Sequence, residues 1–261
     1  MLSTLPILVA LAGPSPTPGP VVAPLPIVRS VAIAAEPALV RTDDKLALRG
    51  DYYPPRRGEN RVPAVLLVHD AGSDRASVAS IAEALQRADF GVLALDLRGH
   101  GESVSEDLDW SEADEEKRAK AWMYATRDLD AGAGWLADQD GIHSTNLTVI
   151  GVGAGGALAV RHALRDDNVR GVGLIGLEEK PFGFDLAEDL YDLEGLPILM
   201  SVAAEERTAA EELVTDLEGD DWITIKPFRS EREELLGEKK LPRAVVEFAE
   251  QHAKPSRRAR G

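Results

Sequence analysis

The sequence predicts an α/β protein with a mostly parallel sheet of seven to eight strands and helices on both faces. Apolar runs of strand length alternate along the chain with segments of helical periodicity, which is typical of strand–helix–strand units. Two of these runs, at residues 63–69 and 91–96, are continuously apolar, as expected for strands buried on both faces. The chain has 261 residues, of which 44% are hydrophobic, enough for one sizeable core.

The globular part is expected at residues 38–252. It opens with two strands within residues 38–53, around a turn at Asp43 and Asp44. The first buried strand follows, and residues 77–88 have the spacing of an amphipathic helix. The later expected elements are the strand at 91–96, one long helix at 117–137, a strand at 147–150 with its helix at 157–164, strands at 169–177 and 196–202, a helix at 208–217, a strand at 222–226 and a helix at 242–251.

Charge and composition exclude several classes of function. The formal net charge of −16 argues against nucleic acid and anionic membrane surfaces as partners, because both repel an acidic protein. The absence of cysteine excludes disulfides, thiolate zinc sites and a cysteine nucleophile. The five histidines show no H-E-x-x-H or H-x-x-E-H spacing, so neither a metal site nor a cofactor is expected.

The two ends of the chain differ from its middle. Residues 1–37 form an apolar, Pro-rich leader, in which residues 5–12 resemble a short signal-peptide core and residues 32–34 an A-x-A cleavage site. No basic residue precedes this run and prolines interrupt it, so a disordered leader is the alternative, and the location stays open between export to the periplasm and the cytoplasm. The leader is too short and too broken for a transmembrane helix. Residues 253–261 form a basic tail, expected to be a solvated end.

The chain is organised around a glycine-rich turn between a strand and a helix at residues 147–160. Such a turn either presents a nucleophile, in the pattern G-x-S-x-G, or cradles a pyrophosphate, in the pattern G-x-G-x-x-G. Gly151, Gly153 and Gly156 match the second pattern literally. They match the first except at one position, because Gly153 stands where the serine should be.

Three segments of the chain together carry a family resemblance. The first is the loop after residues 63–68, which begins with His69 and Asp70. The second is the D-x-R-G-x-G-x-S loop with Asp96, Arg98 and His100, and the third is the glycine turn. In this order and spacing they resemble the α/β-hydrolase family, in particular small members with a minimal cap that are similar to dienelactone hydrolases and serine esterases, although that family usually has glycine where Asp70 stands. The resemblance covers residues 38–252 and implies an α/β-hydrolase fold.

The same resemblance implies the positions of the catalytic groups. The oxyanion-hole N–H groups would come from Ala71 and Ala154, and the acid would be Glu206, with Glu205 as the near alternative. The family histidine would lie in the loop at residues 227–237, where Glu231 stands in its place. The chain is thus identified as a degenerate member that lacks both the nucleophile and the catalytic histidine. His69 and His100 are expected to hold loops rather than to catalyse.

The missing pair predicts a pseudo-hydrolase with a binding or structural role and a vestigial pocket open to a small molecule. Glycine cannot attack an ester, and a glutamate of ordinary pKa is a poor proton shuttle near pH 7. The main alternative is an active hydrolase of small esters or lactones with a non-standard nucleophile. Nearby hydroxyls are Ser73, Ser103, Ser144, Ser201 and Ser230.

Two further interpretations use the same residues. In a dinucleotide-binding protein, Gly151, Gly153 and Gly156 would hold the pyrophosphate and Glu178 the ribose, although the fingerprint normally follows the first strand of its domain. In a paired-carboxylate site, Glu206 and Glu231 would face each other, and one of them would have a raised pKa. The opposing interpretation of this pair is an ion-pair cluster in which Arg207, Arg229 or Arg232 neutralises it.

Overall fold

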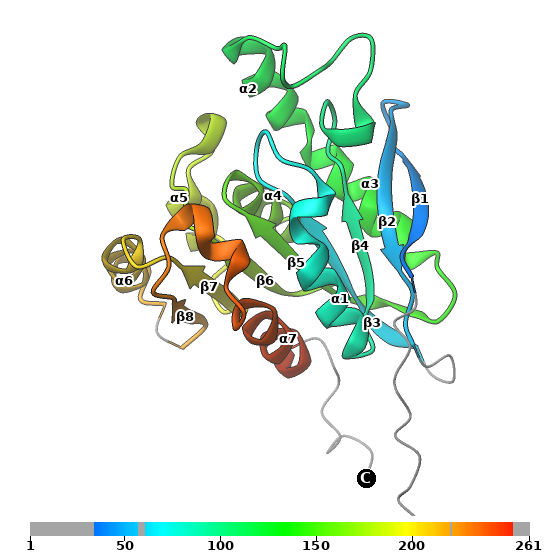
Figure 1. Cartoon of the computed structure of the whole chain (residues 1–261). Coiled ribbons are helices and arrows are strands. Elements are labelled where there is room, and N and C mark those ends of the chain that lie inside the picture. The colour runs from blue at the N-terminus through cyan, green and yellow to red at the C-terminus, as the bar shows by residue number, and fades with distance from the viewer. Residues whose placement is uncertain (1–33, 57–60, 220, 253–261) are drawn as a thin grey trace, which may run out of the picture. The chain divides into compact units, whose positions relative to one another are not determined.

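A computed structural model describes residues 34–56, 61–219 and 221–252 of the chain. These residues form one 8-stranded sheet with helices on both faces (Figure 1). The strand order is β1-β2-β4-β3-β5-β6-β7-β8. The predicted fold class is therefore confirmed. The expected leader as far as residue 33 and the basic tail at 253–261 lie outside the described residues.

The strands are β1 (Glu36–Arg41), β2 (Ala47–Tyr53), β3 (Val62–Val68), β4 (Gly91–Leu95), β5 (Ile142–Val152), β6 (Val169–Ile175), β7 (Ile198–Val202) and β8 (Ile223–Pro227). The strand β2 pairs antiparallel with both β1 and β4, and the other neighbours are parallel. The expected turn at residues 43–44 joins β1 to β2.

The helices are α1 (Ala79–Arg87), α2 (Glu115–Tyr124), α3 (Thr126–Ala137), α4 (Ala154–Ala163), α5 (Leu186–Tyr191), α6 (Arg207–Asp216) and α7 (Leu241–His252), with short 3-10 turns η1 (Arg75–Val78), η2 (Gly101–Ser103), η3 (Pro181–Gly183) and η4 (Arg232–Gly237). The short elements η1 to η4 and α5 were not expected from the sequence, because segments of three to six residues show no readable periodicity.

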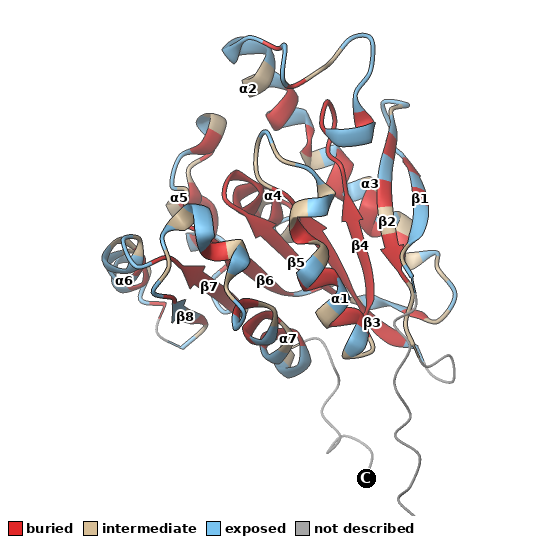
Figure 2. Cartoon of the chain, in the orientation of Figure 1, coloured by how far each residue is buried: buried red, intermediate tan, exposed pale blue. Residues whose placement is uncertain are grey.

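The central strands divide the core into two halves. Along β3, Val65 and Leu67 join the cluster beneath α1 and α7, whereas Leu66 and Val68 join the cluster beneath α3 and α4. Figure 2 shows β3 and β4 buried along their length, while α2 is largely exposed. Burial on both faces explains why the sequence of β3 is apolar without alternation.

The single long helix predicted at residues 117–137 is wrong. The chain instead forms α2 and α3, which meet at Ala125. The break lets Trp122 turn into the core from α2 while Leu129 and Leu136 pack from α3. No proline or glycine marks the break in the sequence. We attribute it to tertiary packing rather than to local helix propensity.

The parallel strands bring the loops of the expected site to one edge of the sheet. The strands β3, β5 and β6 end at Val68, Val152 and Ile175, and the loops that follow all lie at their carboxyl ends. Ligand sites in open α/β sheets form at this edge. No helix in the described ranges is both long and apolar enough to cross a membrane.

Candidate functional site

Gly153 occupies the sharp turn between β5 and α4. Its backbone has φ 50° and ψ −122°, a conformation that glycine adopts more readily than other residues. Its N–H donates to the carbonyl oxygen of Ile175 at 2.9 Å, which ties the turn to the end of the neighbouring strand β6. The turn therefore has the strand–turn–helix form expected of a nucleophile elbow, with no side chain at its apex.

The carboxylate of Asp70 lies where a substrate oxyanion would be expected. Its Oδ1 accepts hydrogen bonds from the backbone N–H groups of Ala71 and Ala154, each at 2.8 Å. These are the two N–H groups that the family resemblance assigns to the oxyanion hole. The structure thus brings Ala71 and Ala154 together, but around an internal side chain.

The position of Asp70 depends on the glycine at residue 153. A Cβ added to Gly153 would overlap both carboxylate oxygens of Asp70. The other oxygen, Oδ2, has no hydrogen-bond partner among the described residues. Oδ1 is therefore fixed by two donors and Oδ2 is not, and both oxygens lie in the space that a side chain at position 153 would fill.

Glu206 is held firmly after β7, where the acid was expected. Its Oε2 accepts from the N–H of Ala203 at 2.9 Å, and its Oε1 accepts from the N–H of Leu177 at 3.0 Å. The guanidinium of Arg232 completes the shell, since Nη1 lies 3.1 Å from Oε1 of Glu206. Three donors therefore fix the position of this carboxylate after β7.

Arg232, rather than Glu231, is the residue that reaches the acid. Glu231 is exposed at the start of η4, whereas Arg232 also donates from Nη1 to the carbonyl oxygen of Leu177 at 2.6 Å and from Nη2 to Glu178 at 3.1 Å. Glu206 and Glu231 are thus not brought together. The arginine neutralises Glu206 and Glu178 as an ion-pair cluster.

A pocket of about 380 Å³ lies at the elbow. Asp70, Gly153 and Arg232 line it, and Val152, Ile175, Leu235 and Leu236 supply apolar walls. Burial raises the pKa of Glu178, which lies beside the Arg232 guanidinium, and the Asp70 carboxylate raises it further, against the opposing effect of Arg232. The site therefore combines an acidic interior with an apolar wall.

His69 and His100 are buried and hold the loops of the site. The Nδ1 of His69 lies 2.7 Å from the carbonyl oxygen of Asp70, and its Nε2 accepts from the N–H of Leu97 at 3.0 Å. His100 is placed likewise, with Nε2 accepting from the N–H of Gly72 at 3.1 Å. Burial lowers the pKa of both rings, and the neighbouring His69 helps to bring that of His100 to about 4.

Asp96 and Arg98 also act within the scaffold. Asp96 is fully buried and accepts from the N–H groups of Arg75 and Glu102, each at 2.8 Å. The buried guanidinium of Arg98 joins α3 to the first hairpin, because it pairs with Asp128 at 2.6 Å and with Asp44 at 2.9 Å. These side chains shape the loop but do not line the pocket at the elbow.

Sequence reasoning missed the contacts of three side chains: Asp70, Glu178 and Arg232. The departure of Asp70 from the usual glycine was a visible signal, but only the fold shows that its carboxylate reaches Ala154, 84 positions away. Arg232 carried no signal, since the expected loop contains two arginines and three glutamates that look alike in the sequence. The direction in which each of these side chains points depends on contacts between loops that are distant in the sequence.

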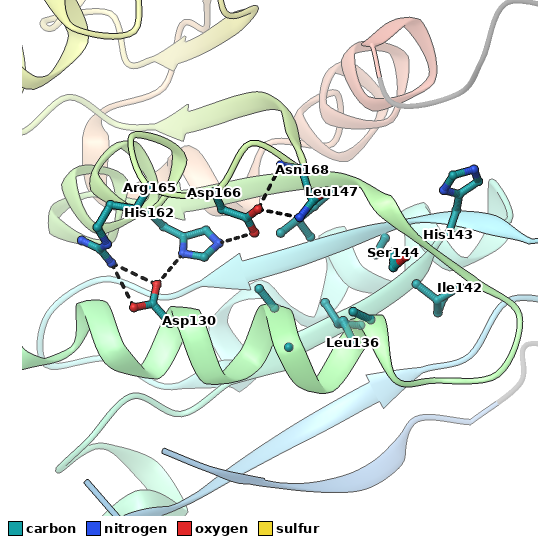
Figure 3. A pocket seen from close by; sticks show the side chains of 14 residues that line it. Asp130, Leu136, Ile142, His143, Ser144, Leu147, His162, Arg165, Asp166 and Asn168 are labelled. Atoms are coloured by element: carbon teal, nitrogen blue, oxygen red, sulfur yellow. Dashed lines mark hydrogen bonds and ion pairs between the residues drawn. The ribbon is translucent and has the colours of Figure 1, made fainter. Parts of the chain in front are cut away.

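A second pocket, of about 320 Å³, lies at the opposite end of β5 (Figure 3). The imidazole of His162 lies there between Asp130 and Asp166, with Nδ1 2.9 Å from Asp130 and Nε2 3.5 Å from Asp166. Arg165 pairs with Asp130 at 3.0 Å. These pairs join α4 to α3 far from the elbow, so we assign them to the scaffold.

Within residues 34–56, 61–219 and 221–252, no group of three or more histidine, aspartate and glutamate side chains is arranged to hold a metal ion. Of the histidines, His69 and His100 already use both ring nitrogens in hydrogen bonds, since Nδ1 of His100 also lies 3.0 Å from the carbonyl oxygen of Arg98. The polar groups at the elbow pocket are carboxylates, a guanidinium, backbone N–H groups and the hydroxyl of Ser73.

Comparison with solved structures supports the same architecture. A dienelactone hydrolase from Anabaena variabilis aligns with a TM-score of 0.64 and 19% identity, covering 84% of this chain and 98% of that one. A cold-adapted esterase from an Arctic intertidal metagenomic library aligns with a TM-score of 0.67 and 17% identity, covering 87% and 97%. An esterase from Pyrococcus furiosus aligns with a TM-score of 0.62 and 16% identity, covering 84% of this chain and 91% of that one. At such identities the likeness shows the fold.

Sequence comparison assigns the family. Uncharacterised proteins from two strains of Mycobacterium tuberculosis are each 32% identical over 111 residues, which is 42% of this chain. The chain spans only 39% of the length of these curated relatives. The model of the alpha/beta hydrolase family matches residues 65–260, about three quarters of the sequence and most of the sheet described above. The chain therefore belongs to the alpha/beta hydrolase family.

Proposed function

We propose that this member of the alpha/beta hydrolase family does not carry out serine-hydrolase chemistry and instead binds a small molecule in the pocket at the elbow. The observation that carries the proposal is the position of Asp70. Its Oδ1 accepts from both Ala71 and Ala154. A substrate carbonyl therefore finds both stabilising N–H groups engaged, and a developing oxyanion would face a carboxylate of the same charge.

The other two requirements of the chemistry are unmet as well. Gly153 offers no hydroxyl, and the side chain that contacts Glu206 is a guanidinium. A guanidinium has no acceptor atom and cannot take a proton from a nucleophile. Neither attack nor proton transfer therefore has a group to perform it at the expected positions.

The serine hydroxyls near the site do not replace the missing nucleophile. Ser73 lines the pocket, and Ser103 donates to the carbonyl oxygen of Asp96. Among the described residues, the buried hydroxyls of Ser201 and Ser230 have no hydrogen-bond partner. In the described part of the chain, no serine hydroxyl is hydrogen-bonded to a histidine. Activation of a serine by a neighbouring base therefore lacks support.

One observation favours a second function, hydrolysis with a nucleophile other than serine. The free Oδ2 of Asp70 faces the space at the apex of the elbow, where a nucleophile would stand. Against this, attack on an ester needs donors for the oxyanion, and Oδ1 of the same carboxylate already occupies them. Binding without turnover is the better supported function.

Nucleotide binding is less well supported by the same geometry. The Asp70 carboxylate accepts the first N–H of α4, the group that a pyrophosphate would need. Glu178, the residue expected to hold a ribose, is engaged by Arg232. A phosphate would thus meet a fixed negative charge at the helix end.

The experiment combines activity with reconstruction. The purified chain is assayed with p-nitrophenyl acetate and a dienelactone, and is labelled with a fluorophosphonate probe. We expect the unmodified chain to hydrolyse both esters no faster than the Asp70→Asn variant does, and to acquire no covalent label. The matched gain-of-function variant joins Gly153→Ser and Asp70→Gly with Arg232→His, and should show measurable esterase activity and labelling. Labelling of the unmodified chain, or hydrolysis that disappears in Asp70→Asn, would contradict the proposal.

A further inference from the structure

We propose that the ligand of the elbow pocket is a small organic cation, an alkylammonium whose N–H groups hydrogen-bond to Oδ2 of Asp70. The proposal rests on the binding function proposed above and names its ligand class. It is carried by three features of the pocket: a fixed carboxylate with one free oxygen, an arginine that is turned away from it, and an apolar wall.

The carboxylate of Asp70 is preorganised to accept a donor. The N–H groups of Ala71 and Ala154 hold Oδ1 at 2.8 Å each, so the side chain need not be ordered when a ligand binds. Oδ2 has no hydrogen-bond partner among the described residues, and Asp70 lines the pocket. Gly153 permits this position of the carboxylate, because a Cβ there would overlap it.

The charge of this carboxylate is not neutralised by a nearby cation. Of the described residues that line the pocket, Arg232 alone is cationic, and its guanidinium binds Glu206, Glu178 and the carbonyl oxygen of Leu177. Glu233 adds a further carboxylate to the lining. The interior therefore attracts positive charge and repels anions.

The remaining wall suits an alkyl group. Val152, Ile175, Leu235 and Leu236 line the pocket, and its volume of about 380 Å³ accommodates a ligand of a few heavy atoms. Pockets of this kind, apolar with a few fixed polar groups, bind small molecules by burying the apolar part and orienting the polar part. An alkylammonium carries both parts in one molecule.

The second pocket lacks this combination. Asp130 is already bound by His162 and Arg165, and Asp166 accepts from the backbone and side-chain N–H groups of Asn168. Its carboxylates are thus engaged by groups of the protein itself (Figure 3). This contrast assigns the cation to the elbow rather than to the opposite end of the sheet.

The test measures binding of n-butylammonium chloride to the full chain by calorimetry, at constant ionic strength, with 1-butanol and sodium butyrate as neutral and anionic probes of the same length. We expect n-butylammonium to bind at least tenfold more tightly than 1-butanol, and butyrate not to bind. The hydroxyl of 1-butanol can donate to Oδ2 as well, but only the cation adds the attraction between opposite charges to the hydrogen bond and the alkyl burial.

The informative variant is Asp70→Asn. The amide oxygen can still accept from Ala71 and Ala154, but the free oxygen becomes an NH₂ donor, so n-butylammonium should bind at least tenfold more weakly. Glu212→Gln removes the same charge from the exposed surface of α6 and should leave binding unchanged. Amide chemical shifts of Ala71 and Ala154 in the unmodified chain provide a readout that needs no variant, and they should move with n-butylammonium but not with 1-butanol.

Equal affinities for n-butylammonium and 1-butanol, equal binding by Asp70→Asn, or unmoved amide signals would each overturn the cation assignment. The failure of this proposal is distinguishable from failure of the proposed function. If no cation binds and no ester is hydrolysed, the pseudo-hydrolase proposal stands and only the ligand class is wrong. If hydrolysis or labelling is found, the function itself is wrong, whatever the cation does.

Discussion

The carboxylate of Asp70 and a side chain at position 153 would occupy the same space. An added Cβ at Gly153 would overlap both carboxylate oxygens of Asp70, and the backbone φ of 50° disfavours other residues there. Asp70 can therefore take both N–H groups of the elbow only because residue 153 is glycine. The missing nucleophile and the occupied oxyanion position are therefore structurally linked, because the glycine that replaces the nucleophile is what leaves room for Asp70.

We expect Gly153→Ala to lower the free energy of unfolding by about 1–3 kcal/mol, because it combines a strained backbone with displacement of Asp70. Urea denaturation followed by circular dichroism measures the change. Gly134→Ala is the matched control: it lies in α3 with nothing within 4 Å of its added Cβ, and it should be neutral or stabilising. Adding Asp70→Gly to Gly153→Ala should recover part of the loss, and equal stability of Gly153→Ala and the unmodified chain would contradict the overlap.

Arg232→Gln tests the ion-pair cluster after β7 and β8. The substitution removes the cation from Glu206 and Glu178 and a donor from the Leu177 carbonyl oxygen, so we expect a loss of about 1–3 kcal/mol in the free energy of unfolding. Arg243→Gln, which breaks an exposed pair with Glu247 on α7, should leave the denaturation midpoint unchanged. If both variants denature alike, Arg232 is no more than a surface charge.

The contribution of His100 to the stability of the chain should fall on acidification between pH 6.5 and pH 4. Burial and the neighbouring His69 lower the pKa of His100 from 6.5 to about 4. Between these two pKa values the unfolded chain binds a proton at this imidazole and the folded chain does not. The stability that this histidine contributes above pH 6.5 is therefore lost as the pH falls to the pKa of the folded chain, about 4. The shift corresponds to about 3 kcal/mol.

Urea denaturation at a series of pH values measures this loss. His100→Asn, which has no ring to protonate, should show a shallower decline between pH 6.5 and pH 4 than the unmodified chain. Parallel curves for the two proteins would show that His100 is not the group responsible, whatever the absolute stability of the variant.

Much of the architecture was readable in the sequence because its signals are local. The continuous apolar run of β3 predicted a strand buried on both faces, and the glycines around residue 153 predicted a tight strand–turn–helix. The D-x-R-G-x-G-x-S loop supplied the family resemblance, and the family match confirms it. The join at Ala125 escaped prediction because the packing of Trp122 and Leu129 decides it.

The sequence by itself determined that Gly153 has no nucleophilic side chain and that the loop at residues 227–237 has no histidine. Only the tertiary structure decided what stands in their place. Asp70 meets Ala154 across 84 positions, and Arg232 meets Glu206 across 26. The directions of such side chains depend on how the ends of parallel strands come together, and no periodicity or local propensity along the chain encodes that meeting.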